Sequence, residues 1–284
     1  MDALVSTGWL AGELGAADLR VVDASYFLPA HGRDAAAEHG AARIPGALFM
    51  DLNAVADATA DLPTMLPSPQ AFADHAATLG IGDGDRVVLY DDSPLRSAAR
   101  AWFTFRHFGL EEVAILDGGL AKWRAEGRPL VSGREPPRRA RFTPHPPRDD
   151  VRTLAQLRAA PGEQLVDARS PSRFAGEEPE PRPGTAAGHI PGSRNLHYAE
   201  LFEPDGTWKR GRSLRAAFEA AAVDPSRPFV ATCGSGVTAA ALVFGAHLLD
   251  GEAALYDGSW SEWGADPTTP KATGRAPSSP SPRT

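Results

Sequence analysis

The chain has 284 residues, of which 42% are hydrophobic and 23% charged, and its formal net charge is -7 at pH 7. This length suits two domains with real hydrophobic cores, and the negative charge argues against a general nucleic-acid-binding protein. The chain has one cysteine and no apolar stretch long enough to span a bilayer, so we expect no disulfide framework, no membrane association and a cytoplasmic location.

Short apolar runs alternate with helical stretches through the first half of the chain. The strands that this pattern predicts cover residues 19–23, 86–90 and 113–116. A helix is expected to begin at Ser68-Pro69, because Ser is a good N-cap and Pro suits the first helical position, and to end at Gly80; another is expected over 94–108. This alternation predicts an α/β fold with a mainly parallel sheet and helices on both faces.

Five segments of the first half return in the same order in the second half. Val21-Val22-Asp23-Ala24 returns as 165–168, Arg43-Ile44-Pro45-Gly46 as 189–192, and Leu116-Asp117-Gly118-Gly119 as 256–259. The offsets are all about 140 to 146 residues, which indicates a tandem duplication of one domain type. We therefore expect an N-terminal domain over 1–133 and a C-terminal domain over 151–270.

Two segments lie outside the duplicated domains. Residues 134–150 are rich in Pro and Arg, which predicts an extended, fairly stiff linker that lies along the acidic surface of one domain rather than binding RNA. The tail over 271–284 is rich in Ser and Pro and is expected to be disordered.

The only cysteine, Cys233, lies between a predicted strand over 228–232 and a predicted helix over 237–249. A thiol on such a turn faces the positive end of the helix dipole and a nest of backbone N–H groups, which favour the nucleophilic thiolate. A buried structural cysteine is the alternative, although it would not need the small residues Gly-Ser-Gly that follow. A phosphatase-type loop is disfavoured, because Ala239 stands where such a loop needs an arginine.

Over nearly its full length the chain resembles the two-domain rhodanese-type sulfurtransferases. The resemblance rests on the duplicated His/Arg-Ile-Pro-Gly segments, the duplicated Asp-Gly segments followed by Trp123 and Trp263, and the Cys-Gly-Ser-Gly-Val-Thr-Ala loop at 233–239. The loop is similar to that of 3-mercaptopyruvate sulfurtransferases, whereas thiosulfate sulfurtransferases carry basic residues in the two positions occupied here by Gly234 and Ser235.

The resemblance implies sulfur transfer from 3-mercaptopyruvate through a persulfide on Cys233, with Ser235 as a second catalytic residue. The loop residues Gly234, Gly236, Val237 and Thr238 would surround the substrate, and Arg173 and Arg182 would bind its carboxylate. The acceptor would be cyanide or a thiol, such as a small thiol or a thioredoxin-like protein, and neither a metal nor a cofactor is expected. Thiosulfate as the donor is the alternative, and a non-catalytic sulfur carrier is a third interpretation.

The sequence departs from the family pattern at two positions of the first domain. Thr64 stands where many mercaptopyruvate enzymes have a histidine, and Asn53 stands where they tend to carry an acid. In addition, Asp91 occupies the position that the duplication assigns to Cys233. A carboxylate cannot carry sulfane sulfur, so we expect the first domain to be catalytically silent.

Overall fold

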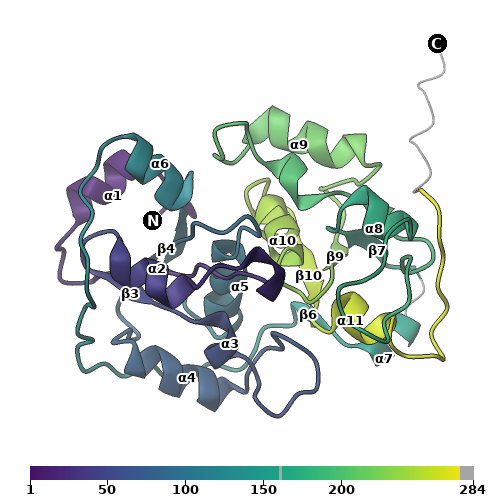
Figure 1. The fold of residues 1–284 in the computed structure, drawn as a ribbon, viewed down its shortest axis with the longest axis horizontal. Helices are drawn as coiled ribbons and strands as arrows, with labels where there is room; N and C mark the ends of the chain where they lie inside the picture. The colour runs from purple at the N-terminus through teal and green to yellow at the C-terminus, as the bar shows by residue number, and fades with distance from the viewer. Residues whose placement is uncertain (160–161, 276–284) are drawn as a thin grey trace. The chain divides into compact units, whose positions relative to one another are not determined.

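The structure is a computed structural model that describes residues 1–159 and 162–275, and the chain divides into two compact units (Figure 1). The first unit comprises Met1–Ala60, Leu66–Arg148 and Pro204–Thr207. The second comprises Asp61–Met65, Asp149–Glu203 and the chain from Trp208 onward. The segment Asp61–Met65 therefore belongs structurally to the second unit, although it lies in the first half of the sequence.

The first unit is built on a five-stranded sheet in the order β1-β5-β4-β2-β3, and all of its strand pairs are parallel. Its strands are β1 (Leu4–Val5), β2 (Leu19–Asp23), β3 (Ala47–Phe49), β4 (Arg86–Tyr90) and β5 (Val113–Leu116). Its helices are α1 (Thr7–Glu13), α2 (Ala35–Ala41), α3 (Leu52–Val55), α4 (Pro69–Thr78), α5 (Ala98–His107) and α6 (Gly119–Ala125), with a 3-10 turn at Pro29–His31. Parallel neighbours need crossover connections, which these helices provide.

The second unit repeats this architecture, with a parallel sheet in the order β6-β10-β9-β7-β8. Its strands are β6 (Val151–Arg152), β7 (Gln164–Asp167), β8 (Arg194–Asn195), β9 (Phe229–Thr232) and β10 (Ala253–Tyr256). Its helices are α7 (Leu154–Ala159), α8 (Pro171–Ala175), α9 (Gly211–Ala220), α10 (Ala239–His247) and α11 (Ser259–Trp263), with a 3-10 turn at Tyr198–Leu201. The two equivalent α/β sheets confirm the predicted fold class and the duplication.

Helices cover both faces of each sheet (Figure 1). In the first unit, α1 and α6 pack on one face through Leu10 and Trp123, both of which are fully buried, and α5 packs against β4 and β5 on the other face. In the second unit, Trp260 and Trp263 of α11 pack on one face, and α10 packs against β9 and β10. The strands between them are therefore buried on both sides, which explains why they read as continuous apolar runs.

The central strands β4 and β9 are followed by equivalent loops and helices. The helices predicted from residues 94 and 237 begin later than expected, at Ala98 and Ala239. In both units the residues in between form the turn at the carboxyl end of the central strand, and Gly236 has a φ of 77° there. In open parallel sheets ligands bind outside this edge of the strands. The helix that was predicted from Ser68 begins as expected, with the Ser68 hydroxyl accepting from Ala71 N at 3.3 Å.

Residues 134–148 lie along the first unit. The Arg138 guanidinium donates to Asp85 at 2.6 Å, and Thr143 N donates to Asp83 at 2.6 Å. Between them the Phe142 ring packs edge-on against Phe72, with 5.4 Å between the ring centroids. The basic linker is thus fixed by acidic side chains and one aromatic contact of the first domain.

The beginning of the expected disordered tail is ordered. Ala272 exchanges two backbone hydrogen bonds with His189, and Gly274 N donates to Ala175 O at 2.8 Å. Residues 271–275 therefore differ from the expectation, because a backbone edge of the second unit was available for pairing. The rest of the predicted tail, 276–284, lies outside the described residues. Among the residues described, no helix combines the length and the apolar character that crossing a membrane requires.

Candidate active site

Cys233 lies at the carboxyl end of β9, the central strand of the second sheet. Strand residues 229–232 are all buried, and Cys233 itself is a free cysteine with 2% of its surface exposed. The loop over 233–238 then leads into α10, so the thiol sits at the strand-to-helix turn that the sequence predicted. This position combines shielding from bulk water with proximity to a helix N-terminus.

The short helix α11 holds the cysteine loop by its carbonyl groups. Trp260 N donates to Cys233 O at 3.0 Å, and both the backbone N and the hydroxyl of Ser261 donate to Gly234 O, at 2.9 and 2.7 Å. The Ser259 hydroxyl accepts from Cys233 N at 3.1 Å and donates to Tyr256 O at 2.8 Å. Sequence reasoning missed the roles of Ser259 and Ser261, although the repeated segment at 256–259 had marked this turn.

Several backbone N–H groups of the cysteine loop are available to a ligand. Within residues 1–159 and 162–275, the N–H groups of Ser235, Val237 and Thr238 have no acceptor in the protein, and neither has the half-buried Ser235 hydroxyl. Free backbone N–H groups on a turn before a helix form a site for an anion. The loop can therefore stabilise negative charge that develops next to the Cys233 sulfur.

Arg173 approaches this loop from α8, which begins at the N-cap Ser170. A Cβ on Gly234 would lie only 3.1 Å from Arg173 Nη2, so a side chain at this position would have to displace the guanidinium. Arg173 is paired with Glu180, whose Oε2 accepts from Nη2 at 2.5 Å. The structure thus brings the predicted Arg173 to the loop, together with an acid that the sequence analysis did not single out.

A buried ion-pair network stands behind Arg173. The Arg169 guanidinium, with a side chain only 1% exposed, donates to Asp167 at 2.6 Å and to Glu180 at 2.7 Å, and it lies over the Trp260 ring at 4.7 Å. Burial alone would lower the pKa of Arg169, but the two carboxylates outweigh burial and raise it. The contacts of Arg169 and Asp167 are therefore structural.

Arg182 is engaged elsewhere. Its Nη2 donates to the backbone carbonyl of Asp61 at 2.7 Å, and in the described parts of the chain no hydrogen bond or ion pair joins Arg182 to the cysteine loop. Asp61 begins the segment that groups with the second unit. Arg182 therefore reaches the segment that borders the loop rather than the loop itself.

Thr64, in the same segment, contacts the loop directly. Its hydroxyl donates to Ser235 O at 2.6 Å, and the residue is 6% exposed. Its φ of 55° is in the left-handed region, which is unfavourable for a β-branched residue. A strained backbone at this contact indicates that the surrounding packing fixes Thr64 against the loop.

In the equivalent loop of the first unit, the Asp91 carboxylate occupies the backbone N–H groups. Asp91 Oδ1 accepts from Ser93 N at 3.1 Å and Oδ2 accepts from Ala98 N at 2.7 Å, so the carboxylate caps α5. Burial raises the pKa of Asp91 to about 6, although the two N–H groups act in the opposite direction.

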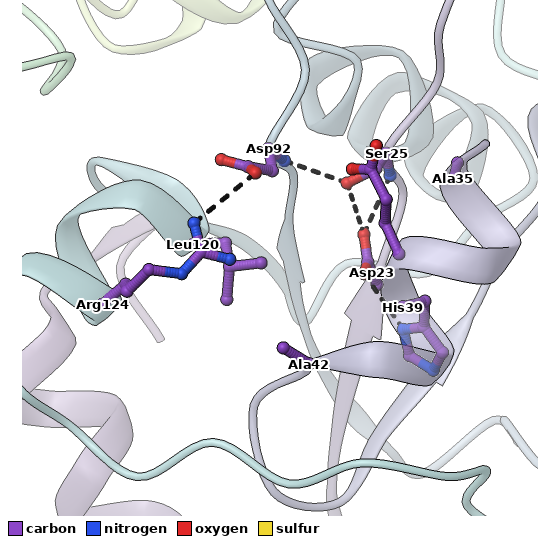
Figure 2. A pocket seen from close by; sticks show the side chains of 9 residues that line it. Asp23, Ser25, Ala35, His39, Ala42, Asp92, Leu120 and Arg124 are labelled. Carbon is purple, nitrogen blue, oxygen red and sulfur yellow. Dashed lines mark hydrogen bonds and ion pairs between the residues drawn. The ribbon is translucent and has the colours of Figure 1, made fainter. Parts of the chain in front are cut away.

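A small polar pocket lies beside this loop (Figure 2). Figure 2 shows interactions among several of the residues that line it: His39 contacts Asp23 at 3.0 Å, Asp92 N donates to Ser25 Oγ at 2.9 Å, and Arg124 lies 3.7 Å from Asp92. Several of the polar side chains that line this pocket are thus engaged by one another, and no cysteine is among its lining residues. In the described ranges, no group of three or more His, Cys, Asp or Glu side chains could hold a metal ion.

Comparison with known proteins identifies the family to which the chain is similar. A model of the rhodanese-like domain matches residues 6–126 and again 150–266. Human 3-mercaptopyruvate sulfurtransferase is 41% identical over 92% of this chain and 91% of its own, and thiosulfate sulfurtransferase of Cricetulus griseus is also 41% identical with the same coverage. The crystal structure of SseA, a 3-mercaptopyruvate sulfotransferase from Escherichia coli, superposes with a TM-score of 0.83 at 35% identity, covering 92% of this chain and 99% of that one.

Proposed function

The chain belongs to the rhodanese family and is a sulfurtransferase, and we propose that it takes sulfur from 3-mercaptopyruvate with Cys233 as the nucleophile. Overall identity does not decide the donor, because relatives named for each donor are equally similar. The proposal rests on the absence of charged side chains at the two loop positions that follow Cys233. Gly234 and Ser235 are neutral, and the Arg173 guanidinium that lies against Gly234 is already paired with Glu180.

In the first half-reaction, the Cys233 thiolate attacks the sulfur of 3-mercaptopyruvate. A sulfur–sulfur bond forms, the carbon–sulfur bond breaks, and its electron pair leaves on carbon as the enolate of pyruvate. The proton of the donor thiol balances the step, because it passes to the enolate carbon and leaves pyruvate and an anionic persulfide. The free N–H groups of Ser235, Val237 and Thr238 would stabilise that anion in a site shielded from water.

The donor also carries a carboxylate that must be held away from the sulfur. Arg173 is the natural partner, since a guanidinium binds a planar carboxylate through two parallel hydrogen bonds. Arg182 would assist after leaving its contact with Asp61 O. The Ser235 hydroxyl would donate to the substrate or to the outer sulfur, and the buried Gly236 would leave room for both.

In the second half-reaction, a thiolate or cyanide attacks the outer sulfur, and Cys233 leaves as a thiolate. Cys233 is the only cysteine of the chain, so no second thiol in the protein can resolve the persulfide. The acceptor must therefore come from outside, as a small thiol or a thioredoxin-like protein. We place this chemistry in the cytoplasm, because such acceptors are kept reduced there.

Thiosulfate is the second candidate, supported by the identity to thiosulfate sulfurtransferases. It is a dianion, and its leaving sulfite would need cationic partners that the neutral Gly234 and Ser235 do not supply. Missing charge pairing of roughly 1.5–3 kcal/mol corresponds to about a ten- to hundredfold preference for 3-mercaptopyruvate.

Steady-state kinetics with both donors and cyanide as the common acceptor test the proposal. We expect kcat/KM for 3-mercaptopyruvate to exceed that for thiosulfate by about ten- to hundredfold. An equal or higher value for thiosulfate would show that the neutral loop does not select the donor.

A further inference from the structure

The Glu180 side chain lies between two guanidinium groups beside the cysteine loop. It is 4% exposed, and its Oε1 accepts from Arg169 Nη1 at 2.7 Å and from Arg173 Nε at 3.3 Å. Its Oε2 accepts from Arg173 Nη2 at 2.5 Å. Glu180 therefore holds one edge of the Arg173 guanidinium by two hydrogen bonds.

The position of Glu180 is itself fixed by buried groups. Arg169 is anchored by the Asp167 carboxylate, by Gly188 O at 2.8 Å and by the face of the Trp260 ring. Because Arg169 cannot move without breaking these contacts, the Glu180 carboxylate has a defined place and orientation. The Arg173 guanidinium is thereby directed to the position beside Gly234, where Nη2 lies against the loop.

The network also determines the charge that a substrate meets. Asp167 and Glu180 contribute two negative charges, and Arg169 and Arg173 contribute two positive ones, so their sum is zero. Arg173 can still donate hydrogen bonds to an anion, but it brings little net positive charge, because Glu180 cancels it at short range. Such a site accepts one negative charge on its ligand more readily than two.

We propose that Glu180 is a positioning and specificity-determining residue, which aims Arg173 at the loop and makes the site prefer a monoanionic sulfur donor over a dianionic one. This inference rests on the proposed sulfur transfer through Cys233. It assigns to Glu180 a role that differs from binding, since the carboxylate contacts the substrate-binding arginine and not the substrate.

Glu180→Gln tests the charge while preserving the shape of the side chain. We expect the ratio of kcat/KM for thiosulfate to kcat/KM for 3-mercaptopyruvate to rise about five- to tenfold, because a dianion gains more than a monoanion when one nearby negative charge is removed. Glu178→Gln is the matched control. It removes the same charge two residues away, from an exposed acid that accepts from Ser172 Oγ, and its ratio should stay within about twofold of the wild type.

Arg173→Ala tests the same idea in the opposite direction and remains informative if Glu180→Gln does not fold. It removes a positive charge and leaves the Glu180 carboxylate facing the loop, so both donors should lose activity and thiosulfate should lose more. An unchanged donor ratio in folded Glu180→Gln or in Arg173→Ala would overturn the inference, and so would an equal shift in Glu178→Gln. A wild-type protein that is inactive with 3-mercaptopyruvate would instead overturn the proposed function.

Discussion

The two units place different side chains on the same turn. Asp91 follows β4 and Cys233 follows β9, and each strand is the middle one of its sheet. The backbone is held alike in both, because Leu120 N donates to Asp91 O at 3.0 Å and Trp260 N donates to Cys233 O at 3.0 Å. The scaffold around the turn is therefore equivalent, and the side chain makes the difference.

In the first loop the protein supplies its own anion. The Asp91 carboxylate accepts the N–H groups of Ser93 and Ala98, whereas the equivalent region after Cys233 leaves the N–H groups of Ser235, Val237 and Thr238 for a ligand. One fold thus provides a turn that binds negative charge, and the side chain at its first position distinguishes the capped turn of the first unit from the proposed reaction site of the second.

The largest expected effect comes from exchanging Cys233, the proposed nucleophile. Cys233→Ser should lower sulfur transfer by about a thousandfold or more, because a hydroxyl cannot form a persulfide. Asp91→Asn, at the matching position of the first unit, should leave kcat/KM within about twofold of the wild type. A cyanide-dependent thiocyanate assay compares the two variants, and residual turnover by Cys233→Ser would show that sulfur is carried elsewhere.

We expect the raised pKa of the buried Asp91 to affect the stability of the protein rather than its activity. Its pKa is raised from 3.8 to about 6 in the folded protein, so the folded state binds this proton more tightly than the unfolded state. The stabilisation is complete below about pH 4 and is lost as the pH rises through about 6, a difference of about 3 kcal/mol.

Hydrogen exchange of the peptide that contains β4, followed between pH 4 and pH 7 with correction for the intrinsic rate, measures this stability. We expect protection in the wild type to fall across the window relative to Asp91→Asn, which has no proton to lose. Parallel curves for the two proteins would contradict the raised pKa.

Truncating the two arginines that we propose to bind the substrate should have the next largest effect. Arg173→Ala and Arg182→Ala each remove charge-assisted hydrogen bonds worth about 1.5–3 kcal/mol, which corresponds to about a ten- to hundredfold loss of kcat/KM for 3-mercaptopyruvate. Arg212→Ala, on the exposed surface of α9, is the control and should be unchanged. If kcat/KM of both variants equals that of Arg212→Ala, neither Arg173 nor Arg182 binds the substrate.

The smallest effect is expected at Thr64. Thr64→Val keeps the shape of the side chain but loses the hydrogen bond to Ser235 O, which should lower kcat about three- to tenfold with a smaller change in KM. Thr64→Ser retains the hydroxyl and should recover most of the activity. If Ser and Val behave alike, the hydroxyl does not position the loop.

The sequence predicted the elements that depend on local pattern. The strand over 113–116 was expected and lies at Val113–Leu116, and the loop with Cys233 was recognised from its own residues. Arg173 was expected at the substrate site and lies against Gly234. The strand and the loop follow from contiguous residues, whereas the expectation for Arg173 came from the resemblance to the rhodanese-type sulfurtransferases.

Contacts between distant segments could not be predicted in this way. Thr64 and Ser235 are 171 positions apart, and nothing near Thr64 indicates that its segment groups with the second unit. The position of Glu180 could not be predicted either, because it depends on the buried Arg169. Arg182 itself was expected at the substrate carboxylate, and its contact with Asp61 O arises from the same tertiary packing.

Mass spectrometry of the intact protein after incubation with 3-mercaptopyruvate tests the central claim most directly. The wild type and Asp91→Asn should each gain the mass of one sulfur atom, located at Cys233, which cyanide removes as thiocyanate. Cys233→Ser should gain none. An adduct that persists in Cys233→Ser, or a wild-type protein that gains no sulfur while it turns over the donor, would contradict a persulfide at the only cysteine.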